Sequence, residues 1–238
     1  LELARPVARA RVAAGAVVSP VAVPDWLHQP APQEERPSRP LAPSALGDDQ
    51  VADPPATPAL RRAAERGRLL HALFERLPGV VAAQRRAAAD AWLAATGGIA
   101  DAGERRAIAD AALAVIEAPG FADIFGPDAL AEAPIAAVVG AQVVAGTVDR
   151  LLVTPERVLI VDFKTGRQVP RTVAEVPDYH LKQMGGYAAA LRVIFPDRPV
   201  EAALLYTAGP RLLPLDAALL ARHKPVLAPV QQSLDEGA

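Results

Sequence analysis

Cysteine is absent from the 238 residues of this chain. Its absence excludes disulfides, thiolate zinc sites, iron–sulfur clusters and cysteine nucleophiles. The cytoplasm is therefore the compartment that we expect, because proteins of oxidising compartments are the ones that rely on disulfides. Whatever chemistry the protein performs has to come from other side chains.

The chain also lacks long apolar runs, a charge excess and a nucleotide-binding loop. Its longest apolar stretches are interrupted by Arg, Asp or Glu, so none approaches the ~20 residues of a membrane span. With 25 Lys+Arg against 27 Asp+Glu the formal net charge is −2, which provides no global positive field for a polyanion. No GxxxxGK(S/T) sequence is present, so we do not expect ATP hydrolysis by this chain alone. We expect a soluble protein, with no membrane partner, that binds any nucleic acid locally or receives it from another component.

The first residues indicate a fragment of a longer protein. Leu1 is not methionine, and the opening residues lack the basic start, apolar run and small-residue cleavage site of a signal peptide. With 51% hydrophobic residues, the chain can form one substantial core and an additional irregular arm. We therefore expect one catalytic domain.

Proline is concentrated at the beginning of the chain, where nearly half of the 24 prolines precede residue 60. That density disfavours helices and interior strands and favours an extended path. We assign residues 1–56 to a linker or strap and residues 57–238 to the catalytic domain. Trp26 and Leu27 in the strap either dock on the folded domain or form an apolar spot on a mobile tether.

The catalytic domain divides by its periodicity into a helical part (57–126), a sheet and catalytic core (127–216) and a C-terminal tail (217–238). Apolar spacing predicts three helices, at about 57–77, 80–95 and 102–117. Strand periodicity then predicts an antiparallel meander of three strands, at 133–140, 142–153 and 157–165. The remaining elements are a helix at 179–195 and strands at 201–207 and 212–215. The fold class is α/β, with a mixed sheet flanked by helices.

The segment VLIVDFKTG contains the most informative residues. Alternation along a strand places Asp162 and Lys164 on one face, just before the turn at Thr165. Antiparallel pairing would bring Asp149 of the preceding strand near Asp162. Close carboxylates repel each other unless a cation neutralises them, and hard oxygen ligands suit Mg²⁺ or Mn²⁺. The alternatives are a surface ion pair at the strand end and, for Asp149, a structural bond to Arg150 or to a turn amide.

Other candidates lie on predicted helices. Gln183 and Tyr187 are four residues apart and so share a helix face, although a tyrosine there can also serve only to pack the core. Gly185 and Gly186 between them would allow a close approach to the sheet or to a nucleic-acid backbone. His71 lies among apolar helix residues, where it is either a core histidine or a ligand.

Together these segments resemble the RecB-like branch of the PD-(D/E)XK nucleases. The pattern of that branch is G-x3-H, G-x-(I/V)-D-R, D-(F/Y)-K-T-G and Q-x3-Y. All four segments are present in this order, within about residues 57–210, as Gly67–His71, Gly146–Arg150, Asp162–Gly166 and Gln183–Tyr187. Within the branch, the chain most resembles the C-terminal nuclease domain of AddA-type helicase–nucleases, which process DNA double-strand breaks. The sequences PDWL and RPLAPS are similar to the link between the helicase and nuclease parts of such proteins.

The resemblance implies a restriction-endonuclease-like fold and a magnesium site, with Mn²⁺ as a substitute. The implied metal ligands are His71, Asp149, Asp162 and the backbone carbonyl of Phe163. The implied catalytic residues are Asp149, Asp162, Lys164, Gln183 and Tyr187. Lys164 would orient or help deprotonate the attacking water and stabilise charge on the phosphate. Gln183 and Tyr187 would position the nucleic-acid backbone near the metal.

Charged residues near these motifs are less specific candidates. Glu132, in AEAPI, is either part of the outer coordination sphere or an ordinary acid at a strand edge. Basic residues flank the motifs and either contact phosphates without sequence preference or remain solvated: Arg66, Arg68, Arg167, Arg171 and Lys182.

The implied activity is exonucleolytic cleavage of single-stranded DNA during recombinational repair. The expected partners are DNA, helicase domains of the same full-length chain and a second, AddB-like subunit. One alternative is a non-catalytic DNA-binding or scaffolding relative, which the intact Asp149, Asp162 and Lys164 disfavour. Another is a stand-alone RecB-like exonuclease, which the proline-rich strap disfavours. A CRISPR-associated nuclease of the iron–sulfur type is excluded because the chain has no cysteine.

Overall fold

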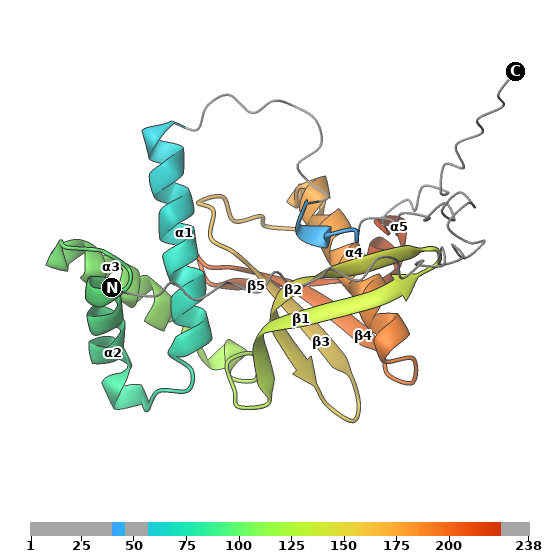
Figure 1. The fold of residues 1–238 in the computed structure, drawn as a ribbon, viewed down its shortest axis with the longest axis horizontal. Coiled ribbons are helices and arrows are strands. Elements are labelled where there is room, and N and C mark those ends of the chain that lie inside the picture. Colours follow the sequence, from blue (N-terminus) through green and yellow to red (C-terminus); the bar gives the residue numbers. More distant parts are fainter. Residues whose placement is uncertain (1–39, 46–56, 225–238) are drawn as a thin grey trace, which may run out of the picture. The chain divides into compact units, whose positions relative to one another are not determined.

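The computed structural model describes residues 40–45 and 57–224 (Figure 1). These residues belong to one compact unit that comprises residues 38–238. Most of the predicted strap, including Trp26 and Leu27, lies outside the described residues, as does the end of the predicted tail. None of the helices that the structure describes has the length and apolar character needed to cross a membrane.

Three helices form the first part of the described domain, as predicted: α1 (Pro58–Arg76), α2 (Ala82–Ala95) and α3 (Ala102–Ile116). Thr57 caps α1 by accepting a hydrogen bond from the Leu60 amide at 3.2 Å, and Pro58 occupies the first turn, where no amide donor is needed. Asp101 caps α3 in the same way, accepting from the Glu104 amide at 2.7 Å. The apolar faces of the three helices bury one another and one face of the sheet.

A mixed sheet of five strands, in the order β1–β5, forms the centre of the domain (Figure 1). The first three strands are the predicted antiparallel meander: β1 (Ala129–Val139), β2 (Gln142–Val153) and β3 (Val158–Lys164). Helix α4 (Asp178–Ile194) connects β3 to the parallel strand β4 (Val200–Tyr206), and β5 (Arg211–Leu215) pairs antiparallel with β4. The predicted fold class, a mixed sheet flanked by helices, is confirmed.

Strand β3 separates two apolar cores. Val158 and Ile160 point into the core that α4 covers, whereas Val161 and Phe163 point into the core beneath α1, α2 and α3. Asp162 and Lys164 continue the series that faces α4, as the alternation predicts. The end of β3 therefore presents a carboxylate and an ammonium group toward α4.

Several local features differ from the sequence prediction. Strand β1 begins at Ala129 and not at residue 133, because pairing with β2 extends to Ala129 opposite Leu152. Pro134 is tolerated within β1 because this strand is at the edge of the sheet.

A Cβ atom on Gly185 would collide with the His223 carbonyl at the end of α5 (Ala217–Arg222). Gly185 thus accommodates α5, not the sheet or a nucleic-acid backbone.

Part of the predicted strap pairs with the sheet. Leu41 forms a parallel bridge with Val144, and its amide donates to the Val143 carbonyl at 2.7 Å. A short 3-10 helix, η2 (Pro43–Ala45), follows it. Residues 40–45 therefore cover the section of β2 that extends beyond β3.

Candidate active site

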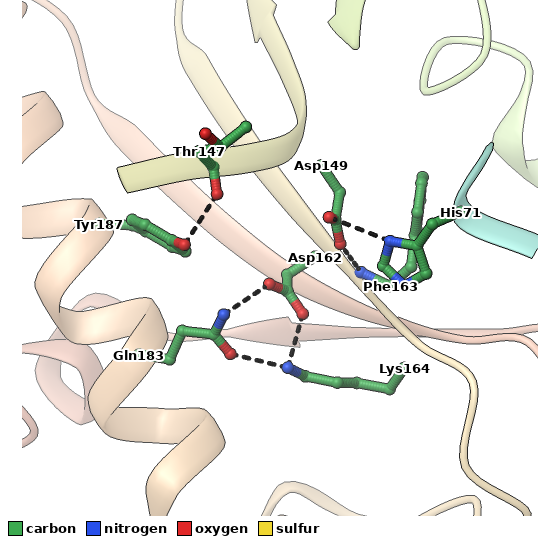
Figure 2. Close-up of polar contacts among 8 residues, drawn as sticks. All are labelled: His71, Thr147, Asp149, Asp162, Phe163, Lys164, Gln183 and Tyr187. Atoms are coloured by element: carbon green, nitrogen blue, oxygen red, sulfur yellow. Dashed lines mark hydrogen bonds and ion pairs between the residues drawn. The ribbon is translucent and has the colours of Figure 1, made fainter. Parts of the chain in front are cut away.

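The two predicted aspartates lie where β2 and β3 separate. In the pairing of these strands Arg150 is opposite Val161, so Asp149 and Asp162 occupy the next pair of positions. There the Asp149 carboxylate accepts a hydrogen bond from the Phe163 amide at 2.5 Å (Figure 2). The Asp149 side chain thus bonds to a backbone amide of β3 just beyond the last hydrogen-bonded pair of β2 and β3. This bond fixes the Asp149 carboxylate beside Asp162.

His71 reaches the same place from α1. Its Nδ1 atom is 3.3 Å from Oδ1 of Asp149, and its ring lies edge-on to the Phe163 ring, with centroids 5.7 Å apart. Burial alone would lower the pKa of His71, but the hydrogen bond and the charge of Asp149 outweigh it and raise the pKa above its usual value. The imidazole is therefore in a negative field that would also attract a metal cation.

Helix α1 can place His71 there because Gly67, one turn earlier, lacks a side chain. A Cβ atom on Gly67 would lie 2.6 Å from Oγ1 of Thr165, closer than two unbonded atoms can approach. The glycine of the first motif therefore packs directly against the threonine of the D-F-K-T-G segment. This contact joins α1 to the turn that follows β3.

Arg150 holds the other end of α1. Its buried guanidinium donates to the carbonyl of Phe74, in the last turns of α1, and to the Ala129 carbonyl at 3.2 Å. It also lies over the Phe125 ring, 5.3 Å from the centroid. The hydrogen-bond partners of Arg150 are thus carbonyls and not Asp149, and the residue ties the helical part to β2.

A closed network of polar contacts lies next to the His71–Asp149 pair and joins Asp162, Lys164 and Gln183 (Figure 2). The Lys164 ammonium lies 2.7 Å from Asp162 Oδ2 and donates to Gln183 Oε1 at 2.7 Å, while Gln183 Nε2 donates to Asp162 Oδ1 at 3.0 Å. Burial, followed by repulsion from Asp149, raises the pKa of Asp162 to about 6 despite the opposing effect of Lys164. Asp162 therefore ionises at a higher pH than an ordinary aspartate, and a further positive charge near it would favour its ionised form.

Tyr187 bonds to the strand that carries Asp149. Its side chain is 1% exposed, and its hydroxyl donates to the Thr147 carbonyl at 2.8 Å. The two residues of the Q-x3-Y segment thus have different contacts. Gln183 bonds to Asp162 and Lys164, whereas Tyr187 packs in the core and bonds to the G-T-V-D-R segment of β2.

Glu132 is placed closer to the site than its sequence context indicates. It is on β1 opposite Asp149, and His71, Glu132 and Asp149 offer ligand atoms that lie within 4.8 Å of one another. Its φ of 47° is the only positive value for a non-glycine residue among the described residues. Burial and the charge of Asp149 raise the pKa of Glu132. Counting residues outward from the turn at Gly140 would have revealed this pairing.

The basic candidates differ in their surroundings. Arg68 and Lys182 form exposed ion pairs, with Glu65 at 2.6 Å and with Asp178 at 2.9 Å. Arg167 lines a pocket that Lys164 also lines, and the other four basic candidates are not part of that lining.

The acids that cluster in the structure are not the same set as the metal ligands predicted from the sequence. Glu132 clusters with His71 and Asp149, whereas Asp162 is turned toward Lys164 and Gln183. All these donors are carboxylate oxygens or imidazole nitrogen, a set that fits a hard divalent cation such as Mg²⁺ or Mn²⁺. The raised pKa of Asp162 fits as well, because a cation would favour its ionised form.

Comparison with known proteins agrees with this geometry. A model of the PD-(D/E)XK nuclease superfamily matches residues 47–236, and the chain belongs to this superfamily. No curated protein matches the chain. Among solved structures the chain is similar to the crystal structure of SSO0001, with 18% sequence identity and a TM-score of 0.29, over 66% of this chain and 81% of that chain.

Membership in the superfamily defines the fold and the general activity. The mixed sheet with helices on both faces is a restriction-endonuclease-like fold. Superfamily membership implies a nuclease that acts on DNA with divalent metal ions. The cluster of His71, Glu132 and Asp149 provides side chains that could hold such an ion.

Proposed function

We propose that this chain is the nuclease domain of an AddA-type helicase–nuclease and cleaves single-stranded DNA exonucleolytically with Mg²⁺, or with Mn²⁺ as a substitute. The observation that carries the proposal is the buried network of Asp162, Lys164 and Gln183 beside the His71–Asp149 pair. A carboxylate with a raised pKa, a lysine and a second acid at one strand end fit phosphodiester hydrolysis better than a purely structural role.

In this proposal His71, Asp149, Asp162 and the carbonyl of Phe163 hold the metal ion. The bound ion would polarise the phosphodiester and lower the pKa of a bound water. Glu132 adds negative charge beside His71 and Asp149 and accepts hydrogen bonds from waters in the outer coordination sphere.

Lys164 and Gln183 act next to the metal ligands. The Lys164 ammonium, 2.7 Å from Asp162, orients the attacking water and places positive charge where the pentacovalent phosphate becomes negative. Gln183 holds both Asp162 and Lys164 in position from α4. Tyr187 is a positioning residue that acts through the Thr147 carbonyl of β2.

The role in recombinational repair follows from the motif resemblance. With a formal charge of −2, the chain has little general attraction for DNA, which is consistent with a strand delivered by helicase domains of the same full-length protein. An AddB-like subunit is the second partner that we propose, and the cytoplasm the compartment.

The proposal is tested with short labelled single-stranded DNA and the purified chain. We expect Mg²⁺-dependent cleavage that Lys164→Ala and Asp162→Ala each reduce at least ~100-fold while the domain stays folded. Arg157→Ala is the matched control, because it removes a surface ion pair with Glu201 at the opposite end of the same strand. Cleavage that persists in excess chelator, or in the Lys164 variant, would refute the assignment.

A further inference from the structure

A pocket of about 770 Å³ lies beside Lys164. It is formed by the loop after β3, the first turn of α4 and the end of β4, and its volume is within the range of small-molecule sites. The polar residues of its lining that the argument uses are Lys164, Arg167, Tyr179, His180 and Tyr206, and its one carboxylate, Glu175, accepts a hydrogen bond from the Arg171 amide at 2.9 Å. We refer to it as the Tyr206 pocket.

Two neutral polar groups in the wall of this pocket have no hydrogen-bond partner among the described residues. They are the hydroxyl of Tyr206, whose side chain is 2% exposed, and Nδ1 of His180; both residues line the pocket, and both atoms are buried, so a ligand reaches them only after a small side-chain movement. A buried polar atom without a partner destabilises a fold, and a ligand that bonds to it removes that cost. Burial and the nearby charge of Lys164 lower the pKa of His180 to about 4, so its ring is neutral at pH 7.

The mouth of the pocket has an exposed aromatic ring. Tyr179 is 49% exposed and meets the His180 ring edge-on, with centroids 4.2 Å apart. Exposed aromatic rings beside a charged groove are the surfaces on which unpaired bases stack. Arg167, also exposed, adds a positive charge to the same wall.

We propose that the Tyr206 pocket holds one unpaired base of the DNA strand next to the phosphate that is cleaved. The base stacks on Tyr179, and its edge bonds to the Tyr206 hydroxyl and to His180. Neutral donors and acceptors suit the edge of a base, whereas the phosphates on either side meet Lys164 and Arg167. A paired base cannot enter, because its faces are stacked and its edge is bonded. The inference rests on the proposed function and explains a requirement for single-stranded substrate.

Base stacking is measured without cleavage, in excess chelator, by the fluorescence of 2-aminopurine placed at successive positions of an oligonucleotide. We expect quenching at one position in the wild type, its loss in Tyr179→Ala, and its retention in Tyr179→Phe, which keeps the ring. In the presence of metal, Tyr179→Ala should raise the KM for single-stranded DNA by about 5- to 150-fold, the loss typical of one stacked base.

Tyr206→Phe separates a ligand role from a structural one. The hydroxyl has no partner among the described residues, so its removal should not lower the melting temperature, yet it should weaken oligonucleotide binding several-fold. An abasic site at the quenched position should slow the wild type at least as much as Tyr179→Ala does, and it should slow Tyr179→Ala less than it slows the wild type.

The outcomes distinguish the pocket from the nuclease activity. If the wild type cleaves DNA but the Tyr179 and Tyr206 variants keep its KM and its quenching, the pocket proposal is wrong and the proposed function stands. If quenching depends on Tyr179 but no variant and no wild-type protein cleaves DNA with metal, the pocket binds a base and the proposed function is wrong.

Discussion

His71 is the residue for which a core role and a ligand role give opposite expectations. Its side chain is 30% exposed and its Nδ1 atom lies 3.3 Å from Oδ1 of Asp149, which fits the ligand role that we propose. We expect His71→Ala to weaken Mn²⁺ binding by at least ~10-fold while the free energy of unfolding of the metal-free protein changes by only about 1 kcal/mol. Calorimetric titration and denaturant unfolding provide the two measurements.

A second histidine offers a matched control for this experiment. Nε2 of His223 is 3.1 Å from Asp178, so His223→Ala removes a comparable His–Asp pair that includes none of the candidate ligands. Its Mn²⁺ affinity should equal that of the wild type. Wild-type affinity in His71→Ala would instead leave the two aspartates and the Phe163 carbonyl as the ligands.

Glu132 was predicted only as an outer acid or a strand-edge acid, and its charge can be tested separately from its size. In the metal-free protein, Glu132→Gln should raise the melting temperature, because it removes a carboxylate that is close to Asp149. With Mn²⁺ the same change should lower metal affinity several-fold, because negative charge near the ion is lost.

Thermal unfolding with and without Mn²⁺ measures both effects of Glu132→Gln. Glu156→Gln, in the exposed turn between β2 and β3, is the control and should change neither value. Equal metal-induced shifts in Glu132→Gln and the wild type would identify Glu132 as an ordinary surface acid.

At the level of secondary-structure elements, the contact of α1 with the turn after β3 sets the position of His71. Gly67→Ala should favour the helix by up to ~1 kcal/mol from propensity alone. However, the new Cβ atom would lie 2.6 Å from Thr165 Oγ1 and displace α1. We expect Gly67→Ala to reduce cleavage by up to ~100-fold, since small displacements of catalytic groups have effects of that size.

The displacement can be reversed by a second change in the same contact. Thr165→Ala removes Oγ1 and leaves the Cβ atom at 3.6 Å, an ordinary contact distance. Steady-state cleavage should therefore recover in Gly67→Ala/Thr165→Ala, with Thr165→Ala alone as the reference. A double variant as inactive as Gly67→Ala would show that the contact with Thr165 does not position α1. Full activity of Gly67→Ala alone would show the same.

The same elements show what could be predicted from the sequence. Helices α1 to α4 and the meander β1 to β3 follow from short-range periodicity, and the shared face of Asp162 and Lys164 follows from strand alternation. The longer β1 could not be predicted, because its first residues are held by pairing with β2 and by Arg150. The role of Gly185 depends on α5, which is distant in sequence.

In the domain as a whole, the candidate site forms where three layers meet. Helix α1 brings His71 from one face of the sheet, α4 brings Gln183 from the other, and β2 and β3 supply Asp149 and Asp162 (Figure 2). The order of the motifs can be seen in the sequence. Their distances cannot, because they depend on long-range contacts such as the bonds of Arg150 to Phe74 and Ala129. Glu132 differs in this respect, because its place opposite Asp149 follows from counting residues along the β1–β2 hairpin.

In the proposed site, one metal ion joins the His71–Asp149 pair to Asp162. Anomalous scattering from a crystal of the protein soaked in manganese would locate that ion. We predict one strong peak about 2.1 Å from His71, Asp149, Asp162 and the Phe163 carbonyl oxygen, with Lys164 released from the Asp162 oxygen that binds the ion. No peak at this place, or a peak held by His71, Glu132 and Asp149 with Asp162 still bonded to Lys164, would contradict the proposed site.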